Sequence, residues 1–217
     1  MKIAIMFFGQ LRWFDSFNED FKKYILPKLN GHSVTYFSHF GGTDQTYLQN
    51  FKELYNPLNI LFEEDSSIEE IKEYFNSKTS KISRNLVLQI YSLHKCFSLV
   101  EAQSYNFDLF IKIRTDLKIK SEIDLNVDDQ SVYICRNKNN ISSNIYSTDL
   151  VLLTKNFNIM KKICNMGFDF DEIILRLSNI ENRNLFYHEE ILANYLNFNG
   201  INIKTHNMKI GLARNND

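Results

Sequence analysis

Glycine and proline are scarce in this sequence, which holds 7 Gly and 2 Pro among 217 residues. A collagen-like, linker-rich or disordered chain would need far more of both, so these classes are excluded. No Pro/Gly/Ser linker and no internal repeat divides the chain, and its length suits one large domain better than two. We therefore expect a single domain over residues 1–217.

Cysteine is also sparse. Cys96, Cys135 and Cys164 are odd in number, lie far apart and form no CxxC pair. A secreted disulfide framework or a thiolate zinc site would need more, so both are excluded. We expect buried or partly buried free thiols in a reducing cytoplasm.

The chain lacks an excess charge of either sign and a long apolar run. Its formal net charge of −1 gives no field that steers it toward nucleic acid or anionic membranes. The apolar run Met1–Phe8 is too short for a signal peptide, and no stretch approaches the roughly 20 apolar residues that span a bilayer. We expect a cytoplasmic protein with no nucleic-acid partner and no transmembrane segment. Peripheral association with a membrane is compatible with this expectation.

What the sequence does hold is apolar mass: 44% of its residues are hydrophobic and 14% aromatic. Short apolar runs predict strands at 2–8, 33–37, 58–62, 109–113, 131–135, 149–153 and 201–204. Helical spacing predicts helices at 14–25 (ended by Pro27), after Asp65 or Ser66, and at 83–103, 157–164, 171–177 and 189–198 (ended by Gly200). Strands and helices alternate in the first half, and strands lie closer together in the second. We predict an α/β fold with a mixed, mostly parallel central sheet flanked by helices.

Ligands on such sheets gather at the carboxyl ends of the strands. That rule selects the loops Gly9–Arg12, Ser38–Thr43 and Arg114–Asp116. In the first loop, Gly9 permits close backbone approach, Gln10 offers a donor and an acceptor, and Arg12 suits a phosphate. The alternative is a glycine turn with a solvated arginine.

Arg114-Thr115-Asp116 follows an apolar strand and places one carboxylate at its carboxyl end. A hard divalent cation bound with diphosphate oxygens needs one or two carboxylates. Because Arg114 alternates with Lys112, the segment also fits a half-exposed strand with a surface ion pair.

His188-Glu189-Glu190 opens a predicted helix, where a carboxylate is favoured by the helix dipole whatever its role. The segment is not a zincin motif, because position 192 is Leu. The other histidines, which have no ligand spacing and which we interpret as structural or surface residues, are His32, His39, His94 and His206. The sequence contains no GxxxxGK[ST], GxGxxG or GxSxG, which argues against P-loop enzymes, dinucleotide-fingerprint dehydrogenases and α/β-hydrolases.

Four segments, in order, resemble a family of bacterial and viral glycosyltransferase-like proteins from polysaccharide and lipopolysaccharide gene clusters. The G-Q-x-R turn is matched by residues 9–12, and the Y-D-x-V-I-x-x-R-x-D-L strand by residues 107–117. The Q-x-x-S-x-x-K helix is matched by Gln89, Ser92 and Lys95, and the E-x-x-L-x-x-Y-L helix by Glu189, Leu192, Tyr195 and Leu196.

This resemblance implies a Rossmann-like domain of the GT-A type. The donor nucleotide-sugar would then be bound by Gly9, Gln10, Arg12, Gln89, Ser92, Lys95 and Arg114. Asp116 would hold Mg²⁺ or Mn²⁺ against the diphosphate, with Arg114 supporting Asp116 or touching phosphate. The sequence departs from the DxD pattern of metal-binding members, because Arg114 stands where the first acidic residue would be.

The resemblance further implies sugar transfer to a hydroxyl of a glycan or lipid-linked acceptor in surface polysaccharide synthesis. An inverting reaction needs a carboxylate that takes the hydroxyl proton, and Glu189 and Asp149 are the candidates. Tyr146 and His188 are candidate neighbours of the acceptor. The alternative is a non-catalytic nucleotide-sugar or glycan-binding module of the same fold, favoured by the lone Asp116. A sugar-phosphate nucleotidylyltransferase is less favoured, because no glycine-rich phosphate loop occurs near the N-terminus.

Overall fold

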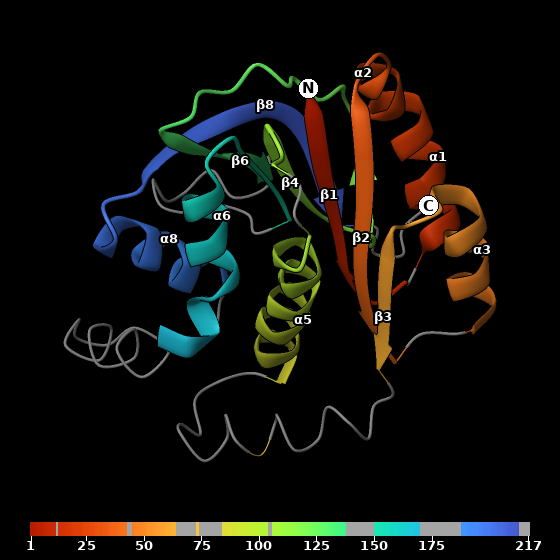
Figure 1. Ribbon diagram of the computed structural model, residues 1–217, viewed down its shortest axis with the longest axis horizontal. Helices are drawn as coiled ribbons and strands as arrows, with labels where there is room; N and C mark the ends of the chain where they lie inside the picture. The colour runs from red at the N-terminus through yellow and green to blue at the C-terminus, as the bar shows by residue number, and fades with distance from the viewer. Residues whose placement is uncertain are drawn as a thin grey trace.

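The computed structural model describes residues 1–11, 13–42, 45–63, 73, 84–103, 106–137, 150–169 and 188–212, with the backbone alone described at 84–87, 136–137, 168–169, 188–191 and 212. Strands within these ranges form one eight-stranded sheet in the order β3-β2-β1-β4-β7-β6-β8-β5 (Figure 1). The strands are β1 (Lys2–Gly9), β2 (Ser33–Gly41), β3 (Asn59–Glu63), β4 (Leu109–Arg114), β5 (Leu117–Ile119), β6 (Ser131–Asn137), β7 (Val151–Thr154) and β8 (Asn202–Leu212).

The sheet is mixed and mostly parallel, as predicted. β3, β2, β1 and β4 run parallel to one another, and β6 is parallel to β8. β7 lies antiparallel between β4 and β6, and β5 is antiparallel to β8 at the edge. The carboxyl ends of the four parallel strands therefore meet at one edge, which is the lower edge in Figure 1.

Helices cover both faces of the sheet. On one face lie α1 (Phe14–Tyr24), α2 (Leu26–Leu29) and α3 (Gln45–Tyr55). On the other lie α5 (Arg84–Glu101), α6 (Phe157–Cys164) and α8 (His188–Phe198), with the 3-10 helix η1 (Met166–Asp169). We call these the α1–α3 face and the α5 face. Within the described ranges, no helix is both long and apolar enough to cross a bilayer.

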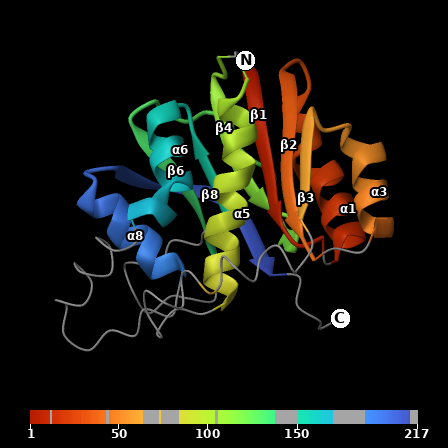
Figure 2. The ribbon, with the colours of Figure 1, turned by 60° about the horizontal axis from the view of Figure 1, so that its bottom comes forward.

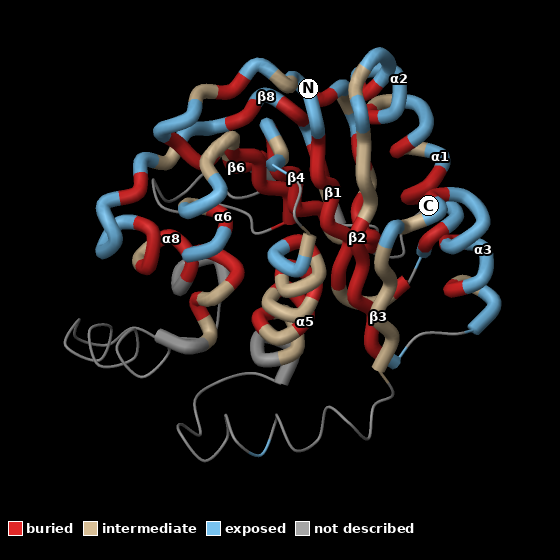
Figure 3. The backbone as a smooth tube through the Cα atoms, viewed as in Figure 1, coloured by how far each residue is buried: buried red, intermediate tan, exposed pale blue. Residues whose placement is uncertain are grey.

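Strand alternation divides the core between these faces. Ile3, Ile5 and Phe7 of β1 join the cluster on the α1–α3 face, whereas Ala4, Met6 and Phe8 join the one on the α5 face. The central strands β1, β4 and β7 are almost wholly buried between the two helical layers, whereas β3 at one edge is half-buried along its whole length (Figure 3). A strand buried on both faces reads as a continuous apolar run, which is why the sequence shows β1 so clearly.

The structure corrects several predicted boundaries. β2 continues to Gly41, and β8 has eleven residues where four were predicted. Helix α3 and strand β5 were not predicted at all. Pro27 lies in the first turn of α2 instead of ending a helix, a position where its missing N–H costs nothing. The predicted helix at 171–177 lies outside the described residues, as does the one after residue 65 apart from residue 73, which is helical.

Candidate functional site

The two predicted loops that follow β1 and β4 meet at the carboxyl edge of the sheet. Thr115 is fully buried, and its Oγ1 donates a hydrogen bond to the backbone carbonyl of Gln10 at 3.0 Å. Gly9 has a φ of 105°, a conformation that residues with a Cβ rarely adopt, so this turn requires glycine. Residues 105 positions apart in the chain therefore share one corner of the molecule.

Arg114 and Asp116 form a two-pronged ion pair beside this corner. Arg114 Nε donates to Asp116 Oδ1 at 2.9 Å, and Arg114 Nη2 donates to Asp116 Oδ2 at 2.6 Å. Both side chains are largely withdrawn from solvent, with 15% and 12% of their surfaces exposed. Partial burial and fork geometry make this pair stronger than an ordinary surface ion pair.

The strand that carries Arg114 is not half-exposed, so that alternative from the sequence was wrong. Every residue from Leu109 to Ile113 is buried, and Lys112 is 0% exposed. Its Nζ lies 4.7 Å from the centre of the Phe8 ring, a cation–π contact. Phe8 belongs to the core of the α5 face and is the register partner of Arg114, so Lys112 and Arg114 project from that same face.

Helix α5 begins at the same edge, with its axis antiparallel to the strands (Figure 2). Ser92 is buried on this helix, and Gln89 is partly buried one turn before it. Lys95 Nζ stands 5.3 Å from the centre of the Tyr91 ring, and its charge acts on His39 of β2. The predicted donor-binding side chains of α5 therefore diverge, with Lys95 beside the β2–β3 end of the sheet.

That end holds a polar cluster of His39, Glu63 and Tyr91 that the sequence did not reveal. The Tyr91 hydroxyl donates to Glu63 Oε1 at 3.0 Å, and His39 Nε2 lies 3.3 Å from Glu63 Oε2. The His39 side chain is 0% exposed, and neither ring nitrogen makes a well-formed hydrogen bond to the described residues. Burial lowers the pKa of His39 and outweighs the opposing effect of the Glu63 carboxylate. Burial, with the hydrogen bond to Glu63, raises the pKa of Tyr91.

The sequence carried one usable signal for this cluster. Phe37 and His39 are two positions apart, so a strand extended beyond Phe37 places both side chains on the same face. Because β2 was predicted to stop at Phe37, His39 was assigned to a loop and interpreted as structural or surface.

Other predicted site residues fall where no side chain is described. Arg12, Asp149 and Tyr146 lie outside the described residues. Glu189 and His188 lie in the first turn of α8, where the backbone alone is described. Their roles stay predictions.

The three cysteines are free and buried, as predicted. Burial raises the pKa of Cys96, Cys135 and Cys164. A thiol that stays protonated is a poor nucleophile and a poor metal ligand, so these residues act as packing groups.

The donor set around Asp116 does not by itself suit a divalent cation. Both carboxylate oxygens are engaged by Arg114. Across the described ranges, no group of three or more His, Cys, Asp or Glu side chains is arranged to hold a metal. Metal binding at Asp116 stays a prediction, and a cation there would share the carboxylate with Arg114.

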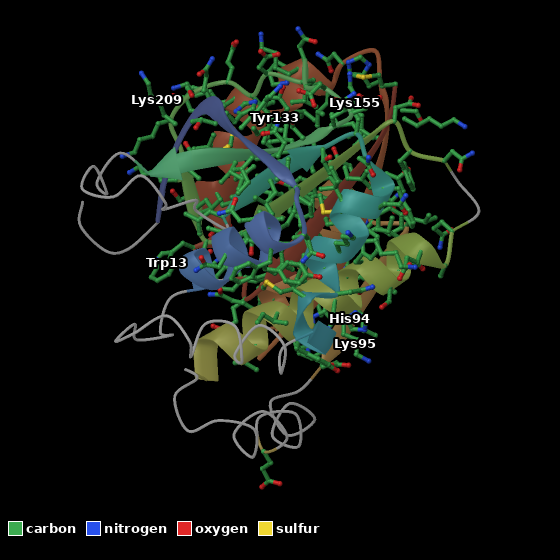
Figure 4. The ribbon with its side chains drawn as sticks, turned by 90° about the vertical axis from the view of Figure 1, so that its left-hand side faces the viewer. Trp13, His94, Lys95, Tyr133, Lys155 and Lys209 are labelled. Atoms are coloured by element: carbon green, nitrogen blue, oxygen red, sulfur yellow. The ribbon has the colours of Figure 1, made fainter. Side chains whose placement is uncertain are left out.

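A shallow open depression lies at the opposite edge of the sheet. It is lined by Met1, Lys28, His32, residues 122–126 and Lys155. In Figure 4, Lys155 lies at the upper edge, whereas His94 and Lys95 lie low on α5. Trp13 follows the Gly9 turn in the left-handed conformation, with φ 55°, and its side chain points outward. The depression borders the amino ends of β1 and β2, away from the ends where ligands of such sheets bind.

Comparison with protein-family models and with curated proteins finds no match for this chain. The site is therefore interpreted from its own geometry and from the sequence resemblance.

Proposed function

We propose that this chain is a glycosyltransferase with a GT-A type fold. It takes a sugar from a nucleotide-sugar donor and transfers it to a hydroxyl of a glycan or lipid-linked acceptor. The observation that carries the proposal is the hydrogen bond from Thr115 to the Gln10 carbonyl. It joins the two motifs on which the family resemblance most depends, at the edge where α/β sheets bind nucleotides.

The proposed donor site lies over the carboxyl ends of β1 and β4, on the α5 face. Gln10 and Arg12 follow β1, and the resemblance adds Gln89 and Ser92 of α5, the helix that packs on this face. Arg114 is the diphosphate-binding residue of the proposal, because guanidinium matches phosphate oxygens in geometry and charge. The resemblance gave Lys95 as a donor-binding residue, but its charge acts on His39 in the cluster with Glu63 and Tyr91.

The proposed reaction is attack of an acceptor hydroxyl on the anomeric carbon of the donor sugar. A new carbon–oxygen bond forms as the bond to the phosphate oxygen breaks, and the nucleoside diphosphate leaves with that electron pair. The hydroxyl proton passes to a carboxylate, for which Glu189 and Asp149 remain the candidates. A divalent cation, where bound, would neutralise phosphate charge, but no step is assigned to it because the Asp116 oxygens already bind Arg114.

One observation favours a second candidate, a non-catalytic module that binds nucleotide-sugars or glycans. Asp116 is paired with Arg114 instead of standing beside a second carboxylate, so the usual metal-binding pair of catalytic relatives is incomplete. Such a module would keep donor affinity and lack turnover.

A ligand panel separates these proposals. Thermal shifts are measured with UDP-, GDP-, CMP- and dTDP-sugars, with and without Mn²⁺, followed by assays of donor hydrolysis and transfer for each ligand that binds. At a hundredfold excess over Kd, a ligand stabilises the folded state by roughly 2.7 kcal/mol. Binding with turnover supports the transferase, and binding without turnover supports the module. A panel in which nothing binds, at millimolar ligand and in both metal conditions, rules out both.

A further inference from the structure

A buried histidine and a carboxylate face each other where β2 and β3 end beside α5, at the lower edge of the sheet in Figure 1. His39 Nε2 and Glu63 Oε2 lie 3.3 Å apart, and both atoms are shielded from solvent. Neither atom has a well-formed hydrogen bond within the part of the chain that the structure describes. Buried polar atoms almost always have a partner, so two such atoms aimed at each other require an explanation.

The separation of these two atoms distinguishes between the species that could join them. A direct, well-aligned hydrogen bond would bring nitrogen and oxygen to about 2.7–3.2 Å. A water bonded to both atoms at about 2.8 Å would hold its two bonds at roughly 70°, far below the tetrahedral angle. Two ligands of one zinc ion, bound at about 2.0–2.1 Å in tetrahedral geometry, lie roughly 3.3–3.4 Å apart. The observed 3.3 Å therefore fits a shared metal ion best.

The chemistry of the surrounding groups also suits a metal ion. Burial lowers the pKa of His39, so its imidazole is neutral near neutral pH, and only a neutral imidazole binds a metal. The Tyr91 hydroxyl donates to the other carboxylate oxygen, Glu63 Oε1, at 3.0 Å. A hydrogen bond of this kind fixes the orientation of a ligating carboxylate. An imidazole beside a carboxylate suits zinc better than magnesium.

We propose that His39 Nε2 and Glu63 Oε2 bind one divalent transition-metal ion, of which Zn²⁺ fits best. The Glu63 side chain, 18% exposed at the end of β3, gives the ion its route from solvent. Water fills the remaining positions, and two protein ligands make a weaker site than the four of a structural zinc centre.

This site is distinct from the carboxylate of Asp116. His39 and Arg114 are both register partners of Phe8, so their backbones lie two strand spacings apart, or about 10 Å. The proposal does not depend on sugar transfer, because the binding of an ion is measured without a nucleotide-sugar.

Calorimetry with ZnCl₂ tests the proposal on the intact chain, and the visible absorption of bound Co²⁺ gives a second readout. The wild type is compared with His39→Leu and Glu63→Gln, each of which removes one ligand. Each change should weaken binding by more than about 100-fold, since even the loss of an outer-shell partner costs roughly 10- to 100-fold. Tyr91→Phe keeps both ligands and should cost about tenfold.

Lys95 gives the test a change of opposite sign. Its charge lowers the pKa of His39, and its Nζ lies 5.3 Å from the centre of the Tyr91 ring. Because like charges repel, Lys95→Met should tighten Zn²⁺ binding about two- to tenfold. Weaker binding by this variant would contradict the placement of the ion.

His32→Leu and Glu53→Gln are the matched controls. His32 lies at the opposite edge of the sheet, and Glu53 is exposed on α3. Both variants should bind Zn²⁺ as the wild type does, which separates the site from general binding to surface histidines and carboxylates. A melting curve without metal shows whether each variant is folded, and Glu63→Gln, which keeps the size of the side chain, decides the outcome if His39→Leu is not.

Two results would overturn the proposal. One is the absence of saturable Zn²⁺ and Co²⁺ binding by the wild type. The other is binding that Glu63→Gln and a folded His39→Leu leave within about threefold of the wild type. The ligand panel for the proposed function gives its own answer in either case.

Discussion

The two faces of the sheet are packed by different chemistry. On the α1–α3 face, Phe7 stands at the centre of an aromatic cluster and contacts the rings of Phe17, Phe21, Tyr36, Phe51 and Tyr55, at centroid distances of 5.0–6.0 Å. The α5 face buries His39, Lys112 and Ser92 among its apolar residues. Aromatic edge contacts add stability beyond area burial, whereas buried polar groups cost free energy. The α1–α3 face also buries a polar residue, Asn18, so the contrast lies in the aromatic cluster on one face and the buried cation of Lys112 on the other.

The largest expected effect is on turnover and concerns α8, which covers the α5 face. If Glu189 is the general base, Glu189→Gln should lower kcat by roughly 10²- to 10⁴-fold and leave donor affinity intact. If Glu189 only complements the helix dipole, the change should cost about 0.3–1 kcal/mol of stability and leave kcat nearly unchanged.

Glu190→Gln is the matched control for this test, since it removes the neighbouring carboxylate of the same turn. Steady-state kinetics and melting temperature are measured for both variants. Full turnover in both would leave Asp149 as the remaining candidate for the base.

The next largest effect is the loss of stability when a ring is removed from the aromatic cluster. Phe7→Ala should destabilise the protein by about 3–5 kcal/mol, because it removes a buried ring and leaves a cavity among its aromatic neighbours. Urea unfolding measures the change, with Phe198→Ala as control because Phe198 is 41% exposed. If the alanine variant does not fold, Phe7→Leu gives a measurable intermediate loss. Equal stability of the Phe7 and Phe198 variants would contradict the role assigned to this face.

A smaller effect probes the buried polar pair within the aromatic face. The Tyr55 hydroxyl donates to Asn18 Oδ1 at 2.9 Å. Tyr55→Phe leaves that oxygen buried without its partner and should cost about 1–3 kcal/mol. Tyr24→Phe removes a hydroxyl from a partly buried tyrosine on the same face and should cost less. Equal unfolding free energies for the two variants would show that the hydrogen bond contributes nothing.

A smaller loss of stability is expected on the α5 face, from removal of a helix-capping residue. Asn156 caps α6, and its Oδ1 accepts hydrogen bonds from the backbone N–H groups of Asn158 and Ile159. Asn156→Ala should destabilise the protein by about 1 kcal/mol, as measured by thermal unfolding. Asn158→Ala, in the exposed first turn of the same helix, is the control and should cost less.

The last prediction is a slope in the pH dependence of stability. The folded-state pKa of His39 lies below the ordinary value of 6.5, so the unfolded chain binds the proton first as the pH falls. The neutral imidazole therefore contributes full stability above pH 6.5, and that stability is lost as the pH falls from 6.5 toward the folded pKa.

The slope is isolated by comparing the wild type with His39→Leu in urea unfolding from pH 7.5 down to 5. The groups around His39 are Glu63 on β3 and Tyr91, Lys95 and Cys96 on α5. Because these remain in the variant, the difference between the two curves reports His39. Parallel curves would mean that His39 titrates normally.

Local spacing in the sequence predicted the elements that are buried in a simple way. β1 is covered by apolar core on both of its faces, so it shows in the sequence as a continuous apolar run. Helix α6 was predicted with its observed bounds, because its apolar residues recur with the 3.6-residue period of a helix. Helix α3 escaped prediction although Leu48, Phe51 and Tyr55 are its buried residues, since three apolar positions among polar ones give a weak signal.

The candidate site was predicted only in part, since residue type and position relative to a strand end can be read locally but contacts cannot. Gln10, Arg114 and Asp116 were selected from the sequence, and their edge was the one expected. The burial of Lys112 and the pairing of His39 with Glu63 depend on neighbours far along the chain. The divergence of Lys95 from Gln89 and Ser92 follows instead from their spacing of three residues along α5, which spreads the three side chains over a broad face.

The sequence by itself determined the alternation of strands and helices, the apolar core and the set of polar residues available at the strand ends. Only the tertiary structure decided that Thr115 reaches the Gln10 carbonyl, and that the Asp116 carboxylate faces Arg114 with both oxygens. The reason is physical: periodicity fixes which side of an element is apolar. Register and packing then decide which distant charges share a low-dielectric corner, where their interaction is strong enough to set the chemistry of the site.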